Sequence, residues 1–235
     1  MTRWACWKGE PVYLTRFFVD PRNRQGIRYQ QNPHLLHAAI YNAMPTQPVV
    51  AQPGESRPLW RLDLGDPRRP ILYVASPEKP ALDDLANEAG QSVDGRVYEV
   101  RDYAPFVEGL QVGQVYAFRL AANPVHQGRH EAGDATKRFG HVTAEQQVRW
   151  LIDHTDKWGF EVLPGVAGVP DVATVSRRRI TFRRGQDMVT LDVADFAGHL
   201  RIVDTGLFRH GLVSGIGHGR AYGCGLMTLA APRPT

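Results

Sequence analysis

The sequence predicts an α+β protein in which one order of elements occurs twice. In the first half, strand-like and helix-like runs follow one another as strand, helix, two strands, helix and strand. In the second half the same order recurs and ends in a strand behind a glycine-rich stretch. This βαββαβ order is that of a ferredoxin-like domain. We therefore expect two tandem ferredoxin-like domains, at residues 12–104 and 114–232, with the stretch 104–114 as the linker.

The composition indicates a globular protein with a polyanionic partner. The chain has 235 residues, 43% of them hydrophobic, which is enough for one large domain or two small ones. It has no apolar run long enough to span a bilayer and only two cysteines, so we expect a cytoplasmic protein with no membrane partner. The net charge of +4 comes wholly from the second half, where most cations are arginines, side chains suited to phosphate oxygens.

In the first half, prolines and polar caps set the element boundaries. A β-branched and aromatic run at 12–20 predicts the first strand, and we expect Arg22, Arg24 and Arg28 in a basic loop behind it. Asn32 as N-cap and Pro33 in the first turn predict a helix that ends before residue 45. The other predicted elements are strands at 59–64 and 71–75, a helix at 81–87 and a strand at 97–100.

Two histidines lie on the predicted first helix. At 3.6 residues per turn, His34, His37 and Tyr41 form a stripe beside the apolar face. Imidazole accepts and donates protons near neutral pH, so such a pair can supply both halves of acid–base catalysis. The alternative is that one or both histidines only pack against neighbours or face water.

The second half gives matching signals. Thr143 and Gln146 form the two ends of a capping box, which predicts a helix start. An exposed polar loop is expected between this helix and the strand before it. The predicted strands are 115–122, 160–163, 199–203 and 226–230, with a hairpin of 172–184 and 188–193 and a helix at 205–213.

The predicted hairpin at 172–193, which we call the basic hairpin, carries five arginines in eight positions. Strand alternation places Arg177, Arg179 and Arg183 on one face and Arg178 and Arg184 on the other, beside apolar residues. These charges repel one another unless a polyanion lies between them, and a two-stranded ribbon fits a nucleic-acid groove. The alternative is a solvated edge hairpin whose charge prevents aggregation.

A second feature is the glycine loop, residues 211–225, with six glycines. Glycine adopts positive φ and lets a partner approach closely, so Gly215, Gly217 and Gly219 are candidate contacts. The loop follows a helix C-terminus, whose dipole repels phosphate, so cations must attract it. The candidates are Arg209, His210, His218 and Arg220. The alternative is a tight helix cap and turn.

A metal site is a rival interpretation. His126, His130, Glu131, Asp134 and His141 include an H-x-x-x-H spacing with carboxylates. Glycines interrupt the helix that this spacing requires, and no HExxH is present. We expect no metal and no cofactor, and we interpret this stretch as a loop near RNA, with Lys137 and Arg138 as phosphate contacts.

Four separated motifs carry a family resemblance. They are Tyr13-Leu-Thr-Arg16, Asn32-Pro-His-Leu-Leu-His37, Phe118-Arg-Leu-Ala-Ala-Asn-Pro124 and the run from Gly215 to Leu226. Together with the two ferredoxin-like halves they resemble the CasE family of CRISPR endoribonucleases, in the RAMP superfamily. The similarity extends over about residues 12–230, and the motifs occur in the order of the family.

The resemblance implies an activity. Proteins of this family cut the precursor CRISPR transcript at the base of each repeat hairpin without a metal, and stay bound to the product within the Cascade surveillance complex. His37 falls on the family's catalytic histidine, and His34 falls where several relatives carry a tyrosine. Asn42 stands where some relatives have a lysine, so charge stabilisation must come from elsewhere.

The chemistry of the residues agrees with that activity. RNA carries its own nucleophile, the 2′-hydroxyl, so a metal-free nuclease must align it, move two protons and stabilise the added charge. We expect His37 to move one proton, His34 the other, and Arg28 or the glycine-loop cations to face the phosphate. The runner-up hypotheses are a non-catalytic RNA-binding subunit and, less favoured, a metal-dependent hydrolase using His126 and His130.

Overall fold

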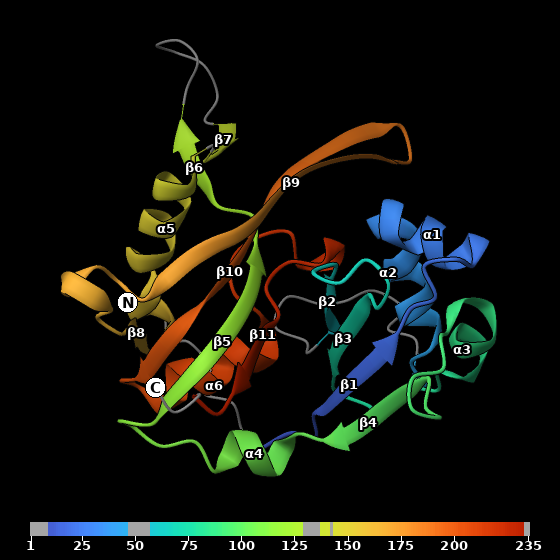
Figure 1. The fold of residues 1–235 in the computed structure, drawn as a ribbon, viewed down its shortest axis with the longest axis horizontal. Helices are drawn as coiled ribbons and strands as arrows, with labels where there is room; N and C mark the ends of the chain where they lie inside the picture. The colour runs from blue at the N-terminus through green and yellow to red at the C-terminus, as the bar shows by residue number, and fades with distance from the viewer. Residues whose placement is uncertain (1–8, 47–56, 129–136, 142, 233–235) are drawn as a thin grey trace.

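The computed structural model describes residues 9–46, 57–128, 137–141 and 143–232. In these ranges the chain forms two large antiparallel sheets side by side, each with its own helices, and a small two-stranded sheet (Figure 1). The first sheet belongs to the N-terminal half and the second to the C-terminal half. The predicted α+β class is confirmed.

The first sheet consists of β1 (Tyr13–Phe18), β2 (Leu59–Asp63), β3 (Ile71–Ser76) and β4 (Tyr98–Asp102). The order across the sheet is β2-β3-β1-β4, and each neighbouring pair is antiparallel. Helices α2 (Pro33–Asn42) and α3 (Asp83–Ala89) bury apolar side chains with those of the sheet in one core. Phe17, Leu36, Ile40 and Leu72 are members of that core.

The predicted cap of α2 is confirmed. Asn32 Oδ1 accepts hydrogen bonds from the backbone N–H groups of His34 and Leu35, at 3.1 and 3.3 Å. Pro33 occupies the first turn, where its missing N–H costs nothing. This cap fixes where the helix begins and therefore which residues share its faces.

The predicted basic loop before α2 is wrong. The chain forms a helix there, α1 (Arg24–Gln31), so Arg24 and Arg28 lie on a helix. Asn23 caps it, because its Oδ1 accepts from Gln25 N at 2.7 Å. Tyr29 is buried in the first core and hydrogen-bonds Glu88, so tertiary packing stabilises this helix. In the sequence, the arginines of this segment suggested a solvated loop.

The second sheet has the order β11-β5-β10-β8, and β9 also pairs with β10. Its strands are β5 (Val115–Ala122), β8 (Phe160–Val162), β9 (Val172–Arg184), β10 (Asp187–Ile202) and β11 (Met227–Ala230). Its helices are α5 (Ala144–Ile152) and α6 (Thr205–Ser214), and the capping box of α5 is present as predicted. Short 3₁₀ turns occur at η1 (Thr155–Trp158), η2 (Val166–Gly168) and η3 (Arg220–Tyr222).

Strand β10 differs from the prediction of two separate strands. It is one continuous strand of 16 residues, irregular only where its pairing with β9 shifts between Asp195 and Phe196. Gly198 lies between the two predicted strands but does not interrupt β10. The strand passes so close to Asp171 at this point that a Cβ on Gly198 would lie 2.2 Å from the carbonyl oxygen of Asp171, so the glycine allows the close approach.

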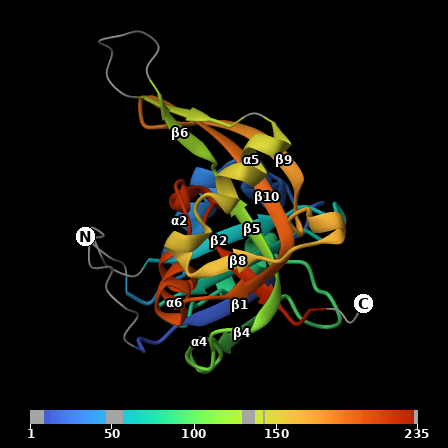
Figure 2. The ribbon, with the colours of Figure 1, turned by 90° about the vertical axis from the view of Figure 1, so that its left-hand side faces the viewer.

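Two more elements lie where loops were predicted. A hairpin of β6 (Val125–Gly128) and β7 (Lys137–Gly140) occupies the predicted polar loop, and α4 (Ala104–Glu108) lies in the predicted linker. The view turned by 90° shows β6 and the β9–β10 hairpin reaching one end of the molecule, opposite α4 (Figure 2). Of the helices in the described ranges, none combines the length and the apolar character needed to cross a membrane.

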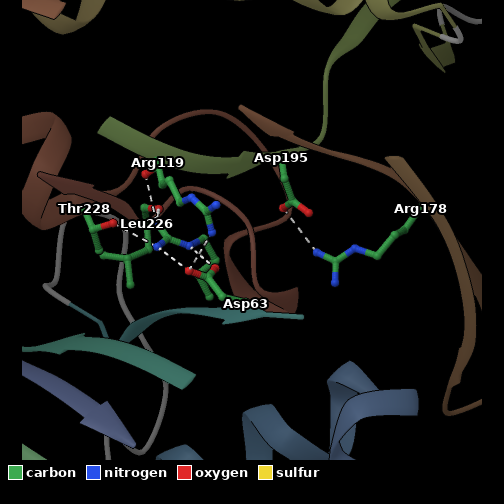
Figure 3. A network of polar contacts seen from close by, with 7 residues as sticks. Asp63, Arg119, Arg178, Asp195, Leu226 and Thr228 are labelled. Carbon is green, nitrogen blue, oxygen red and sulfur yellow. Dashed lines mark hydrogen bonds and ion pairs between the residues drawn. The ribbon is translucent and has the colours of Figure 1, made fainter. Parts of the chain in front are cut away.

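Arg61 on β2 connects the two halves, and Figure 3 shows its partners Asp63, Arg119, Leu226 and Thr228. Its side chain is only 2% exposed and forms an ion pair with Asp63 at 2.6 Å. It also donates to the carbonyls of Arg119 and Leu226, at 2.8 and 3.2 Å, and to Thr228 Oγ1 at 2.8 Å. These acceptors belong to or border β5 and β11, so a buried cation of the first sheet ties it to the second.

Candidate active site and nucleic-acid interface

His37 lies on α2 at the junction of the two halves. Its ring centroid is 4.4 Å from that of Tyr41 and 6.4 Å from that of Tyr222. The residue is half-buried, and its Nδ1 atom is enclosed without a hydrogen-bond partner in the described part of the chain. Packing therefore holds the imidazole in place, and no group of the described residues forms a hydrogen bond with its buried Nδ1 atom.

The surroundings keep His37 uncharged at neutral pH. Burial, together with the smaller effect of the charges of His34, Arg57 and Arg184, lowers the pKa of its imidazole from 6.5 to about 4. A neutral imidazole is the form that accepts a proton. His34 is exposed one turn earlier on the same helix.

Three elements meet at this imidazole. Helix α2 packs against η3 of the glycine loop and against β9 of the basic hairpin. Tyr222 of η3 contacts both His37 and Phe182 of β9, whose ring centroid is 4.6 Å from that of Tyr222. The structure thus brings together the three stretches that the sequence singled out, at one end of the interface between the sheets.

The glycines of the loop are needed for close packing against β2. A Cβ at Gly215 would lie 2.7 Å from Leu59, and one at Gly223 would lie 2.7 Å from the ring of Trp60. Gly215, Gly217 and Gly219 all have positive φ. The glycine loop therefore seats the second half of the protein on the first and forms one wall of the His37 site.

Two of the predicted loop cations hold the protein's own carbonyl groups. Arg220 donates to the carbonyls of Ser214 and Gly217 at 2.7 and 3.1 Å, and so closes the end of α6. Arg209 donates to the carbonyls of Glu108 and Leu110, both at 2.7 Å, and so ties α6 to the linker. His210 is partly buried on α6, which lowers its pKa, and His218 is exposed.

The basic hairpin divides its arginines between ion pairs and open surface. Arg178 pairs with Asp195 at 3.3 Å and Arg179 with Asp192 at 2.7 Å. Arg177, Arg183 and Arg184 are exposed, and the charge of Arg184 acts on His37. The predicted alternation is present, since Ile180 and Phe182 point into a buried cluster between the arginines.

The remaining predicted residues lie on other elements. Arg28, on α1, donates to Gln25 at 3.0 Å. Lys137, Arg138 and His126 lie on β7 and β6, and their side chains are outside the described structure, as are residues His130, Glu131 and Asp134 altogether. His141 lines a groove with His218. Elsewhere in the described chain, no group of three or more His, Cys, Asp or Glu side chains could hold a metal ion.

Sequence reasoning missed two residues of this site. Arg57, just before β2, acts electrostatically on His37, and the ring of Tyr222, from the glycine loop, lies beside that of His37 in a tilted orientation. An aromatic residue inside a glycine-rich loop is a signal that could have identified Tyr222. No local pattern distinguishes Arg57, because only the packing of β2 against the loop brings it here.

Comparison with known proteins identifies the family. The family model described as "CRISPR associated protein" matches residues 12–231, nearly the whole chain. The chain belongs to this family. A curated relative, the CRISPR-associated endoribonuclease Cse3 of Thermus thermophilus, is 28% identical over 93% of this chain and all of its own length.

Solved structures of CRISPR proteins have the same fold. Thermus thermophilus Cse3 bound to an RNA representing a pre-cleavage complex is 27% identical, with a TM-score of 0.77 over 94% of this chain and 99% of its own. A chain of a CRISPR RNA-guided surveillance complex in a pre-nicking state, 23% identical, has a TM-score of 0.62 over 94% of this chain and all of its own. The latter similarity shows the fold alone. The resemblance to the CasE-type endoribonucleases, noted from four sequence motifs, is confirmed.

Proposed function

We propose that this protein is an endoribonuclease that cuts precursor CRISPR RNA at the base of the repeat hairpin, without a metal, and remains bound to the product. The observation that carries the proposal is the neutral His37 where α2, the basic hairpin and the glycine loop meet. RNA held by the exposed arginines of the hairpin lies beside this imidazole. The name of the Cse3 relative, an endoribonuclease, and its pre-cleavage RNA complex support the same activity.

In this mechanism His37 is the general base. The neutral imidazole takes the proton of the 2′-hydroxyl, whose oxygen attacks the adjacent phosphorus in line with the departing 5′-oxygen. The products are a 2′,3′-cyclic phosphate, or the 3′-phosphate formed from it, and a 5′-hydroxyl. His34, one turn away and exposed, supplies a proton to the leaving oxygen. Arg57 and Arg184 stabilise the added negative charge, which makes a lysine at the position of Asn42 unnecessary.

We also propose that residues 12–104 and 114–232 are two ferredoxin-like domains. Across each sheet the strands lie in the order fourth, first, third and second of the βαββαβ sequence. In the second half, β8 and β9 both pair with β10 and together take the place of the second strand. The membership of this chain in the CRISPR-associated family and its resemblance to the CasE family, whose members remain in Cascade, support assembly of this protein, with its RNA, into a Cascade complex.

The test uses a labelled repeat hairpin in single-turnover cleavage with EDTA present. We expect cleavage by the wild type, and none when the 2′-hydroxyl at the cut is replaced by hydrogen. His37→Ala should bind the hairpin with nearly unchanged affinity and lose about 10²–10⁴-fold in rate. His199→Gln is the matched control. His199 lies on β10, where it pairs with Asp171, and this variant should cleave the hairpin normally.

Each other outcome has a distinct meaning. Loss of cleavage in EDTA with rescue by a divalent cation contradicts the metal-free mechanism. Tight binding without cleavage by the wild type identifies a non-catalytic RNA-binding subunit instead.

A further inference from the structure

A groove of about 840 Å³ lies along α5, apart from the ring of His37. One wall is a continuous stripe of α5 and η1 side chains, and the other contains Val125, His141 and His218. A groove of this size accommodates a small-molecule ligand or a few nucleotides. The mechanism proposed above uses none of its lining residues.

Aromatic rings form a stack at the groove. His154 stacks on Trp150 with centroids 5.2 Å apart and on Trp158 with centroids 5.7 Å apart, and the ring planes are within 30° of parallel in both pairs. His154 Nδ1 lies 2.8 Å from the carbonyl oxygen of Trp150, which fixes the ring. Both Trp150 and His154 line the groove, but Trp150 is only 6% exposed and supports the half-exposed ring of His154 from the core. A fixed, partly exposed ring is a surface on which an unpaired base stacks.

The charged groups of the groove suit a nucleic-acid strand. Arg149 and Lys157 supply cations for phosphate, and Glu145 and Asp153 can accept hydrogen bonds from the amino groups of bases. A protein partner fits less well, because the centre of a protein–protein interface is depleted of charged residues and this lining is mostly charged or histidine.

The groove is next to both parts of the RNA site. Gly217 of the glycine loop lies so close to Trp150 that a Cβ would be 3.4 Å from its ring, and His218 lines the groove. At the other side α5 packs against β9, and Arg177 of the basic hairpin acts electrostatically on Glu145. An RNA strand that leaves the foot of a stem bound at His37 would cross the glycine loop to reach the groove.

We propose that this groove binds the unpaired nucleotides that flank the repeat hairpin, by stacking a base at His154 and by holding phosphates at Arg149 and Lys157. The inference rests on the proposed function and adds a subsite for single-stranded RNA. It predicts that affinity for the flank and affinity for the stem are carried by separate surfaces.

The test measures affinity for two uncleavable RNAs, both with 2′-deoxyribose at the cut. One is the hairpin alone and the other is the hairpin with its natural flanks. We expect the flanks to improve the wild-type affinity by roughly tenfold. Arg149→Gln/Lys157→Gln should remove this gain, leave hairpin-only affinity unchanged, and reduce the salt slope for the flanked RNA by about 0.7 per lost cation. Arg96→Gln/Arg201→Gln is the charge-matched control, since Arg96 pairs with Glu99 and Arg201 with Glu161, and none of these residues lines the groove.

A second readout does not depend on charge. Flanks that carry 5-iodouridine should crosslink on irradiation to the peptide that contains residues 149–158, and RNAs with only the 5′ or only the 3′ flank identify the strand. Crosslinks elsewhere, flanks that add no affinity, or an equal loss for both RNAs in the double variant would each overturn the inference. If the wild type does not bind the hairpin alone, the proposed function fails, and a short unpaired oligoribonucleotide then tests the groove by the same crosslink.

Discussion

At the scale of single residues, the protein keeps one imidazole uncharged among cations. A solvated histidine near two arginines would still be partly protonated at pH 6, whereas His37 is also desolvated by Tyr41, Tyr222 and the body of α2. Both effects act in one direction, because each penalises the charged ring. The consequence is an imidazole that is uncharged at neutral pH, the form that the proposed mechanism needs in its general base.

The pH dependence of cleavage tests this account. Because the pKa of His37 is about 4 and cleavage needs the neutral ring, kcat/KM should be retained at pH 5–6, where a histidine with a pKa of 6.5 would be largely protonated. Arg184→Gln removes a neighbouring positive charge, so it should raise the pKa and move the acid limb of the profile to higher pH. The measurement is single-turnover cleavage between pH 4 and 8.

Arg201→Gln serves as the control for that profile, since its ion pair with Glu161 lies on β10 and β8. An acid limb at pH 6.5 in the wild type would contradict the role given to burial of His37.

At the scale of elements, the basic hairpin is a ribbon with a partly neutralised charge. Asp192 and Asp195 project from β10 beside the arginines of β9 and hold two of them. Arg183 and Arg184, near the turn, have no ion pair within the described structure. The end of the ribbon closest to His37 therefore carries the most available positive charge.

Opposite substitutions on this hairpin should change RNA affinity in opposite directions. Arg183→Gln removes one phosphate contact, so it should weaken hairpin binding and reduce the slope of log affinity against log salt by about 0.9. Asp192→Asn frees Arg179 for phosphate, so it should strengthen binding and steepen the slope. The measurement is a salt titration of affinity by fluorescence anisotropy.

Asp66→Asn, in the turn between β2 and β3, makes the same change in net charge at a distance and should leave both quantities unchanged. If it strengthens binding as much as Asp192→Asn, then net charge alone explains the effect, and the ion pair has no special part.

At the scale of the whole molecule, the two halves are joined by a buried cation and by close glycine packing. Arg61 satisfies its guanidinium with Asp63 and three acceptors of the second half, and its charge lies 5.2 Å from the centre of the Tyr73 ring. Asp195, across the same small cavity, has its pKa raised by burial, an effect that Arg178 opposes. The interface therefore depends on a few polar groups with matched partners.

Removing the cation should destabilise the protein strongly. Arg61→Met leaves Asp63 with only its longer ion pair to Arg119, and it leaves two carbonyls without this donor, so we expect the free energy of unfolding to fall by roughly 3–5 kcal/mol. Arg61→Met/Asp63→Leu should recover most of this loss, because a buried ion pair replaced by apolar groups costs little. Urea denaturation of the three proteins is the measurement, and a single variant as stable as the wild type would contradict the role of Arg61.

Local signals predicted much of this architecture, and the exceptions have a common cause. Asn32-Pro33 and Thr143–Gln146 act within one turn of the chain, so the starts of α2 and α5 were predictable. Helix α1 and the continuous β10 depend on Tyr29 packing on α3 and on Gly198 crossing Asp171, contacts that join distant residues. Sequence alone suggested extended or broken chain at both places.

The candidate site shows the same division. His37 and the glycine loop were recognisable from residue type and from family motifs. Arg57 was not, because only the seating of the loop on β2 brings it to α2. Tyr222 had one local signal, an aromatic residue in a glycine-rich loop, but its place beside His37 depends on the same seating. Arg209 and Arg220 were expected to face phosphate, and their binding to backbone carbonyls depends on where α6 ends in three dimensions.

The seating of the glycine loop limits how this protein can be engineered. The same few backbone positions touch Leu59 and Trp60 on one side and carry Tyr222 and His218 on the other. Substitutions in the glycine loop should therefore change the stability of the protein and its rate of cleavage together. Variants selected for heat tolerance should accumulate elsewhere, while those selected for a new RNA repeat should change the arginine ribbon first.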